Sequence, residues 1–309
     1  MRTPSVTVII PALNGEQTLG PCLRAVLEQR YGGRIETVVI NDGSTDATSS
    51  LAKSFPGVVV LDQQNRGRSA ARNRGAAESS GEIIAFTDAD CLPRKEWVEK
   101  LVARLLMLEK GGIVGGAMVL PKNANLWQRI DHQAWAHSTG PEAPAGPSLL
   151  ASTANMCMFR NVFKEAGGFD ERFSGSEDSD LALRVHRAGH RNYFEPAAVV
   201  EHHHPRTTFR AFFRQRYNYG KWTIQTVLRH RPLTPYSWMF PNNRALLALF
   251  WPGYALLATG FTVLRAWRSD VSVLWLSPLH LMGRLVEYLG TVAGCAEYQR
   301  KFAGNGRAQ

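Results

Sequence analysis

Cysteine is scarce in this chain of 309 residues, and its four cysteines stand far apart. Cys22, Cys91, Cys157 and Cys295 have none of the short spacings of a zinc or iron–sulfur site. This argues against a cysteine metal centre and indicates a reducing compartment. The sequence also lacks a long low-complexity tract and an internal repeat, and its length is ample for a sizeable hydrophobic core.

Two signals are absent near the amino terminus. A polar start runs directly into an apolar strand without a secretory h-region, so we expect the amino-terminal domain to remain cytoplasmic. The Gly-x-Gly-x-x-Gly turn of nicotinamide dehydrogenases is missing after this strand, where residues 11–16 read Pro-Ala-Leu-Asn-Gly-Glu. A dehydrogenase is therefore a poorly supported interpretation.

Acidic residues are scarce in the last third of the chain. Residues 1–200 contain 22 Lys plus Arg and 22 Asp plus Glu, whereas residues 201–309 contain 14 and 4, so the net charge of +10 lies there. Basic residues at 206–221 alternate with aromatic ones, a pattern typical of a helix at a membrane surface. A nucleic acid is the other partner that such a segment would suit, but we expect none, because an apolar run follows.

That run, residues 245–264, is uncharged and just long enough to span the ~30 Å core of a bilayer. Pro252 and Gly253 near its middle permit a kink or a re-entrant hairpin. Residues 271–295 contain His280, Arg284 and Glu287 and suit an interfacial element better than a span. We expect attachment to the cytoplasmic face of a membrane, peripheral or anchored; the alternative is a helical cap buried on the catalytic domain or in a dimer.

The most informative feature that is present lies at residues 83–91, where an apolar strand runs into Asp88 and Asp90. Side chains two apart on an extended segment point the same way. Two adjacent carboxylates repel unless they are neutralised, and a divalent cation with oxygen ligands does this. The pattern indicates a metal–diphosphate site, although an acidic turn or helix cap would also fit.

The surrounding segments predict an α/β fold. Residues 6–11, 36–42, 58–61 and 83–87 read as buried strands, and residues 18–29, 45–55 and 69–79 read as the helices between them. Such units form a parallel sheet whose ligands lie beyond the carboxyl ends of the strands. Asn14, Asp42, Asp88 and Asp90 all fall at those ends.

These segments resemble the family 2 glycosyltransferases with the GT-A fold. The resemblance covers about residues 4–220 and rests on five ordered motifs, at residues 8–16, 39–46, 65–75, 87–90 and 167–181. It implies a Rossmann-like, mostly parallel central sheet flanked by helices in a catalytic domain over residues 1–225. A helical, membrane-associated region would follow over residues 226–309.

The resemblance also implies a nucleotide site. Pro11, Ala12, Glu16 and Asp42 would border the base, and a carboxylate at Asp42 suits the imide N–H of uracil; the alternative is a turn cap before the helix near residue 45. Arg72 would reach base or phosphate, although Arg66, Arg68 and Arg74 are alternatives. Asp88 would face the ribose.

By the same resemblance, Asp90 binds the metal that bridges the diphosphate. His202, which follows an apparent strand at residues 197–201, completes the metal site, and an imidazole ligand favours Mn²⁺ over Mg²⁺. If the strand continues, His204 shares the face of His202 and His203 points away. A polar strand end without metal is the alternative.

The Glu177–Asp178 pair resembles the family's catalytic pair, with Asp178 as the base that deprotonates the acceptor hydroxyl. Acidic residues are also favoured in the first turn of a helix, a role that we assign to Asp180. Asn155 and Phe169 are expected on the acceptor side, with Phe169 or Trp127 stacking on a sugar unless these aromatics belong to the core.

The resemblance thus implies a hexosyltransferase-type enzyme. It would transfer a sugar, with inversion, from a nucleotide-diphosphate sugar, expected to be a UDP-sugar, to a cell-envelope or lipid-linked glycan. The Gln-x-x-Arg-Trp motif of processive synthases is not matched at residues 215–222, so we expect transfer of a single sugar. A retaining transferase of the same fold and a non-catalytic nucleotide-binding membrane scaffold remain alternatives.

Overall fold

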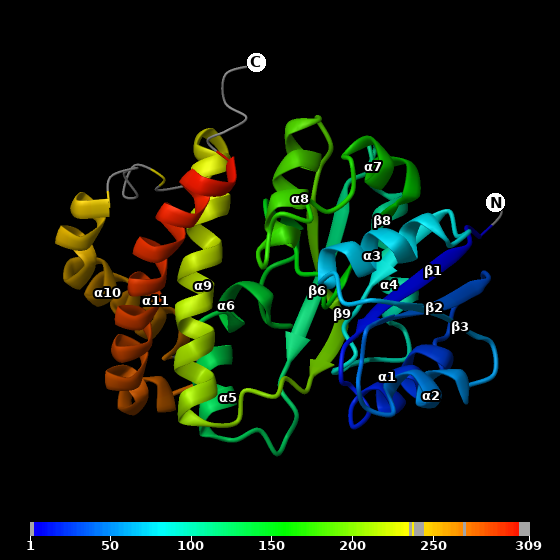
Figure 1. The fold of residues 1–309 in the computed structure, drawn as a ribbon, viewed down its shortest axis with the longest axis horizontal. Helices are drawn as coiled ribbons and strands as arrows, with labels where there is room; N and C mark the ends of the chain where they lie inside the picture. The colour runs from blue at the N-terminus through cyan, green and yellow to red at the C-terminus, as the bar shows by residue number, and fades with distance from the viewer. Residues whose placement is uncertain (1–2, 235–236, 238–243, 268–269, 303–309) are drawn as a thin grey trace. The chain divides into compact units, whose positions relative to one another are not determined.

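The computed structural model describes residues 3–234, 237, 244–267 and 270–302. The chain forms two compact units, Met1–Pro121 with Ser138–His204, and Lys122–His137 with Pro205–Gln309 (Figure 1). The expected domain boundary after residue 225 lies inside a helix of the second unit.

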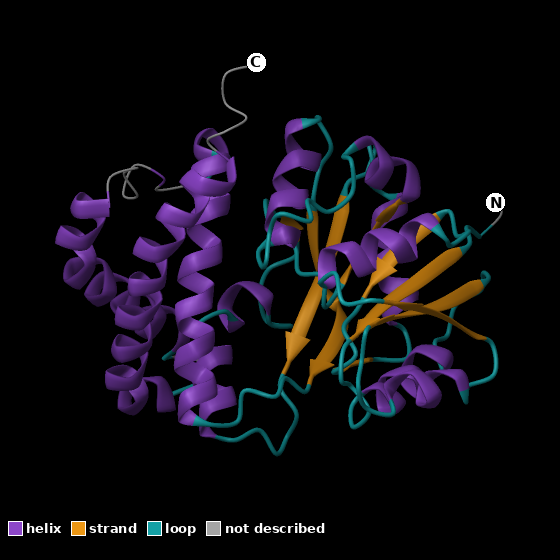
Figure 2. Ribbon diagram, viewed as in Figure 1, coloured by secondary structure: helices purple, strands orange, loops and turns teal. Residues whose placement is uncertain are grey.

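The first unit alternates strands and helices along most of its length (Figure 2). Its strands are β1 (Val6–Ala12), β2 (Ile35–Asp42), β3 (Val58–Gln63), β4 (Ile83–Phe86), β5 (Cys91–Pro93), β6 (Ile113–Val119), β7 (Gly146–Pro147), β8 (Met156–Phe159) and β9 (Tyr193–His202). Its helices are α1 (Leu19–Leu27), α2 (Thr48–Lys53), α3 (Arg68–Ala77), α4 (Trp97–Leu106), α7 (Arg160–Glu165) and α8 (Glu177–Arg187), and α6 (Ala136–Thr139) crosses the boundary between the units.

Within the described residues, all nine strands form one sheet in the order β3-β2-β1-β4-β8-β6-β9-β5, with β7 on β9. The pairs among β3, β2, β1 and β4 are parallel, as is β6 with β9. β8 runs antiparallel between β4 and β6. The mostly parallel α/β fold expected from the sequence is confirmed, and so are its first four strands.

The sheet separates two hydrophobic clusters, because successive side chains of a strand point to opposite faces. In β1, Val8 and Ile10 pack with α1 and α4, whereas Ile9 packs with α3 and α8. In β4, Ala85 and Phe86 divide in the same way. These three layers fix the strand ends at which the polar residues lie.

The second unit is helical and consists of α5 (Leu126–Gln133), α9 (Phe209–Arg229), η1 (Arg231–Leu233), α10 (Arg244–Ala266) and α11 (Ser272–Phe302). α11 packs along α9, and α10 packs on α11. Within the described residues, no helix combines the length and hydropathy that a bilayer crossing requires. Residues 245–264, which the sequence left open as a span, a kinked segment or a re-entrant hairpin, form part of one helix.

Two basic residues of α9 form ion pairs inside the second unit, whereas Arg210 and Arg214 are exposed. Arg216 is buried and pairs with Asp131 at 3.3 Å and with Glu287. Lys221 pairs with Glu297 at 2.7 Å. The charges of Arg216 and Lys221 are thus neutralised within the second unit.

Candidate active site

The loops after β1 and β2 are locked together by side chains of the first motif. Asn14 has a left-handed backbone conformation with φ of 52°. Its side-chain Oδ1 accepts a hydrogen bond from the Thr45 backbone amide at 2.9 Å, and its backbone amide donates to Ser44 Oγ at 2.9 Å. Glu16 accepts from the Ala47 amide at 3.0 Å. Glu16, predicted to border the base, therefore shapes the loop that would do so.

Asp42 lies at the end of β2, beside the partly buried Pro11 and buried Ala12 that end β1 in the paired register. Its carboxylate accepts from Gln63 Nε2 at 2.7 Å and from the amides of Arg66 and Gly67 at 2.9 Å each. It thus anchors the segment 63–67 rather than the turn before α2. Three of the four acceptor positions of a carboxylate are used, which leaves one for a ligand.

Arg72 of α3 joins two carboxylates from different elements. It is fully buried, donates from Nη1 to Glu177 at 2.7 Å and donates from Nη2 to Asp88 at 2.7 Å. A buried guanidinium with two charge-assisted bonds holds both partners in fixed positions. Arg72, expected to reach base or phosphate, instead positions Asp88 at the end of β4 and Glu177 at the start of α8.

Asp178 lies beside these buried ion pairs of Arg72 and is itself only partly buried. Its carboxylate accepts from the Ser179 amide at 2.7 Å and from the Thr153 amide at 3.4 Å. Burial and the charge of Glu177 raise its pKa to about 6, although Arg72 opposes this. A carboxylate with a pKa near neutrality is suited to accept a proton from a hydroxyl group.

Asp90 and His202 lie together because β5 pairs antiparallel with β9, which sets Cys91 opposite His202. His202 Nε2 is 3.4 Å from Asp90 Oδ1, and ligand atoms of Asp90, Cys91 and His202 all lie within 4.8 Å of one another. Burial raises the pKa of the Cys91 thiol, which stays neutral and donates weakly to Asp90. The two remaining donors, an oxygen and an imidazole nitrogen, fit Mn²⁺ or Mg²⁺.

The other two histidines divide as the strand pattern predicts. The His204 ring is buried, with its centroid 5.4 Å from that of His202. His203 Nε2 instead lies 2.7 Å from Glu201 Oε1.

Asn155 and Phe169 do not have the side-chain environment expected of acceptor-side residues. Asn155 is buried, accepts from Trp97 Nε1 at 2.7 Å, and donates to the carbonyls of Ala117 and Ala198 at 2.7 and 2.8 Å. It therefore ties β8 to β6, β9 and α4.

The Phe169 ring is buried and packs edge to face on Phe86 and Phe163, with centroids 5.2 and 5.5 Å away. Phe169 takes the core role that its sequence left open. Trp127 likewise packs within the second unit, on Phe209 and Phe212, with centroids 5.4 and 5.7 Å away.

Sequence reasoning missed the backbone contribution to the site. Ser176, with φ of 60°, directly precedes α8, and within the described chain it and Asn14 are the only non-glycine residues with positive φ. Such strained residues concentrate at functional sites. The Thr153 amide on Asp178 comes from a loop 25 residues earlier, and no periodic signal in the sequence points to it.

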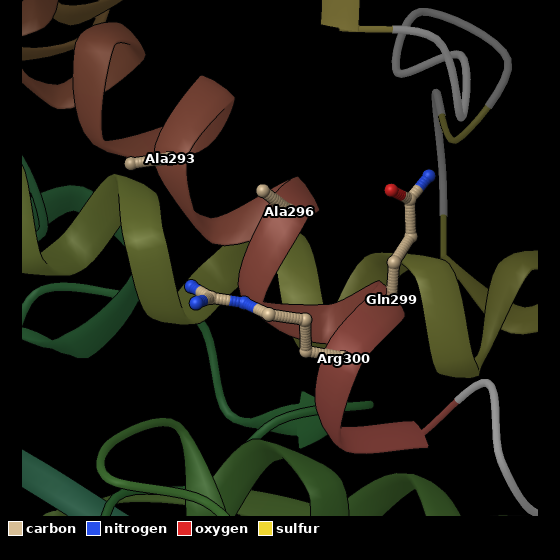
Figure 3. A pocket seen from close by; sticks show the side chains of 4 residues that line it. All are labelled: Ala293, Ala296, Gln299 and Arg300. Atoms are coloured by element: carbon tan, nitrogen blue, oxygen red, sulfur yellow. The ribbon is translucent and has the colours of Figure 1, made fainter.

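A shallow hollow on α11 is lined by Ala293, Ala296, Gln299 and Arg300 (Figure 3). No predicted site residue lines it. Because titratable groups with convergent geometry lie at the strand ends instead, those ends remain the candidate active site.

Comparison with known proteins gives a family and relatives. Residues 7–167 match the family described as Glycosyl transferase family 2. The probable glycosyltransferase YdaM of Bacillus subtilis is 31% identical over 241 residues, which cover 73% of this chain and 57% of YdaM. Glycosyltransferase AglE of Haloferax volcanii is 29% identical over 236 residues, which cover 74% of this chain and 76% of AglE. The chain thus matches little more than half the length of YdaM.

Two solved structures are similar in fold. The mannosyltransferase PcManGT from Pyrobaculum calidifontis, in complex with GDP-Man and Mn²⁺, has a TM-score of 0.67 and 21% identity over 96% of this chain and 88% of that one. S. aureus TarS 1–349 in complex with UDP has a TM-score of 0.55 and 17% identity over 97% and 92%. At these identities the likeness shows a common fold.

Proposed function

This chain belongs to glycosyl transferase family 2, and we propose that it transfers one sugar, with inversion, from a nucleotide-diphosphate sugar to an acceptor hydroxyl group. The observation that carries the proposal is the convergence of Asp88, Asp90, Asp178 and His202 at strand ends and at the start of α8. The buried Arg72 is linked to this set through its ion pairs with Asp88 and Glu177.

Asp90 and His202 are the proposed ligands of a divalent cation, which when bound would offset the charge of the leaving diphosphate. Their donor types suit Mn²⁺ and also admit Mg²⁺. PcManGT and GalNAc-T7, which share the fold, have structures with Mn²⁺. Asp88 faces the ribose in this proposal.

Asp178 is the proposed base. Its carboxylate takes the proton of the acceptor hydroxyl while the acceptor oxygen bonds to the anomeric carbon and the bond from that carbon to the diphosphate oxygen breaks. Attack opposite the leaving group inverts the anomeric centre. A pKa of about 6 keeps the carboxylate ionised at neutral pH and makes it a stronger base than an exposed Asp.

We infer that the nucleobase of the donor is uracil, and that Pro11, Ala12 and Asp42 border it. The remaining acceptor position of Asp42 suits the imide N–H of uracil. TarS, of the same fold, has a structure with UDP, whereas PcManGT has one with GDP-Man. The identity of the nucleobase is therefore the part of the proposal that needs measurement first.

The proposed acceptor is a cell-envelope or lipid-linked glycan presented at the cytoplasmic face of a membrane. Support comes from the charge of residues 201–309, which contain 14 Lys plus Arg and 4 Asp plus Glu. Among the relatives, the succinoglycan biosynthesis protein ExoA of Rhizobium meliloti is 26% identical over 80% of this chain.

Calorimetric titration of the full chain with UDP, GDP, ADP and TDP, with and without Mn²⁺, tests the proposal. We expect UDP to bind best, and only with metal, and Asp90→Asn to abolish this metal-dependent binding. Glu109→Gln, at an exposed carboxylate beyond α4, is the matched control and should bind as the parent does.

A preference for GDP or TDP would retain the transferase and overturn the role of Asp42. Binding of none of the four nucleotides would overturn the proposed nucleotide site. Once a donor is known, the anomeric configuration of the product, read by proton NMR, separates inversion from retention, and only inversion requires Asp178 as base.

A further inference from the structure

Helix α10 buries small and polar side chains and exposes large apolar ones. Among the residues of α10 whose side chains the structure describes, the buried ones are Ala255, Thr259, Thr262 and Ala266. Its exposed large apolar residues are Leu249, Leu256, Leu257, Phe261 and Leu264. The buried set recurs every three to four residues, and the exposed set lies at positions that a helix places on the opposite side, so each set occupies one face of the helix. A helix that meets water on its outer face has the opposite arrangement.

The buried side of α10 combines polar and aromatic contacts, because Tyr254 packs against a hydrophobic cluster that includes Ile224, Leu228 and Tyr288. Thr259 and Thr262 donate to the carbonyls of Ala255 and Ala258, four residues earlier, at 2.8 and 3.0 Å, a pattern that lets threonine sit in a helix away from water. α11 contributes the buried Glu287, paired with Arg284 at 3.0 Å. The second unit therefore has polar groups as well as a hydrophobic cluster behind the apolar face of α10.

The apolar surface continues beyond the end of α10. Trp267, Val271, Leu274 and Trp275 are exposed, and 84% of Trp275 is accessible. Seven large apolar residues are thus exposed between positions 257 and 275. Indole rings are enriched where an apolar phase meets water, because the ring is apolar and its N–H is polar.

We propose that this α10 face, formed by Leu249, Leu256, Leu257, Phe261, Leu264, Trp267, Val271, Leu274 and Trp275, docks on the surface of an anionic lipid bilayer. Charge argues for lipid. A second copy of the chain would bring together two regions that each carry 14 Lys plus Arg against 4 Asp plus Glu, whereas an anionic surface attracts such a region.

Arg265 shows how cation and apolar face combine. It is exposed, and its guanidinium lies 5.9 Å from the centroid of the Phe261 ring. A long arginine side chain can rest along apolar surface while its charged end reaches a phosphate headgroup. In this proposal the helix that meets lipid is α10, whereas the sequence suggested the basic, aromatic residues 206–222.

This inference shares with the proposed function the expectation of an acceptor at a membrane, but the two are tested separately. Nucleotide binding is measured in the absence of lipid, and lipid binding in the absence of nucleotide. Failure of one experiment therefore leaves the result of the other intact.

The test is flotation of the full chain with vesicles of phosphatidylcholine alone or with phosphatidylglycerol added. We expect binding to the anionic vesicles that weakens as salt is raised. The double variant Leu257→Glu/Phe261→Glu should lower the partition coefficient about 100-fold, since two apolar side chains no longer enter the lipid. Trp275→Ala should remove part of the blue shift in tryptophan fluorescence on binding.

Leu106→Glu/Met107→Glu is the matched control, because both side chains are exposed in the first unit, outside the α10 face. It should bind vesicles as the parent does. Equal loss of binding in the control and the test variant would overturn the proposal, as would absence of binding by the parent. A parent that ignores vesicles and forms a dimer dispersed by Leu257→Glu/Phe261→Glu, seen by analytical ultracentrifugation, would assign the face to a second copy.

Discussion

Asp178 has a pKa of about 6, which places its titration within an accessible pH range. As a base it must be ionised, so kcat/KM should be level above about pH 7 and fall about tenfold per pH unit below 6. Asp178→Asn should lower kcat about 10³-fold and abolish this acid limb. Initial rates with the donor found by calorimetry, measured from pH 5 to 9, test both statements.

The stability of the same variant distinguishes a catalytic from a structural carboxylate. Burial and Glu177 disfavour the ionised form of Asp178 in the folded state, so its ionisation costs stability above about pH 6. Asp178→Asn should therefore melt at a higher temperature than the parent at pH 8, and the difference should vanish near pH 4. A variant less stable than the parent at pH 8 would contradict the assignment and indicate a structural role.

Arg72 is a positioning residue whose effect reaches the base through charge. Its guanidinium lowers the pKa of Asp178, and it neutralises the buried Glu177. Arg72→Met should move the acid limb of kcat/KM to higher pH and, by leaving the buried Glu177 with only the exposed Arg68 at 3.8 Å, destabilise the fold by about 3–5 kcal/mol. Thermal melts and pH–rate profiles measure the two effects.

Arg74, on the same helix, provides the matched control. It forms an exposed i,i+4 pair with Glu78 at 2.7 Å, and such pairs contribute little. Arg74→Met should change stability by no more than about 0.5 kcal/mol and leave the pH profile in place. If Arg72→Met moved the melting temperature but not the acid limb, Arg72 would be structural only.

At the scale of elements, α9 and α11 approach so closely that glycine is required between them. A Cβ added to Gly220 would overlap the carbonyl oxygen of Glu287, and one added to Gly290 would overlap that of Tyr217. Gly220→Ala must therefore push the helices apart, and we expect a loss of about 1–3 kcal/mol in the free energy of unfolding. Chemical denaturation followed by circular dichroism measures it.

Gly260 of α10 is the control for this substitution. A Cβ at Gly260 meets no atom within 4 Å, so Gly260→Ala should stabilise its helix by about 0.5–1 kcal/mol. Opposite signs for the two substitutions would establish close packing as the cause. Two stabilising results would show that α9 and α11 are further apart than the structure has them.

The elements also show what a sequence reveals. β1 to β4 and their helices were predictable, because each strand is a short β-branched run that ends at Pro, Asn or Asp. The antiparallel insertion of β8 between β4 and β6 was not, since strand order depends on contacts between segments 40 or more residues apart. Asp90 and His202 were predictable as a pair through resemblance, whereas their proximity depends on the pairing of β5 with β9.

The sequence indicated which single residues are candidates for the site, but not which side chains they contact. Arg72 was expected to bind a ligand, yet its two partners are carboxylates at positions 88 and 177. Phe169 lies in the fifth motif and Asn155 lies before it, and neither position reveals whether a side chain faces a substrate or the core. The large apolar residues of α10 were visible in sequence, but their exposure follows from the packing of α10 on α11.

For the whole molecule, acid should be destabilising in both units. Hydrogen bonds and cations lower the pKa of several carboxyls, namely Glu36, Asp62, Asp270, Glu287 and Glu297. A lowered folded-state pKa gives stability that is present above the unfolded pKa and lost as pH falls through the folded pKa. Melting temperatures should therefore fall below about pH 4.5 and continue to fall to about pH 2, where Asp62 titrates.

Glu287 is the carboxylate that most sharply tests this account, because it is buried between Arg216 and Arg284. Glu287→Gln would leave Arg216 with Asp131 alone, so we expect a loss of about 3–5 kcal/mol at pH 7 and a weaker dependence of melting temperature on acid. Glu297→Gln, which removes a half-buried partner of Lys221, should cost less than about 1 kcal/mol. If the melting temperatures of the parent and of Glu287→Gln fell by the same amount between pH 7 and pH 3, the acid dependence would arise elsewhere in the chain.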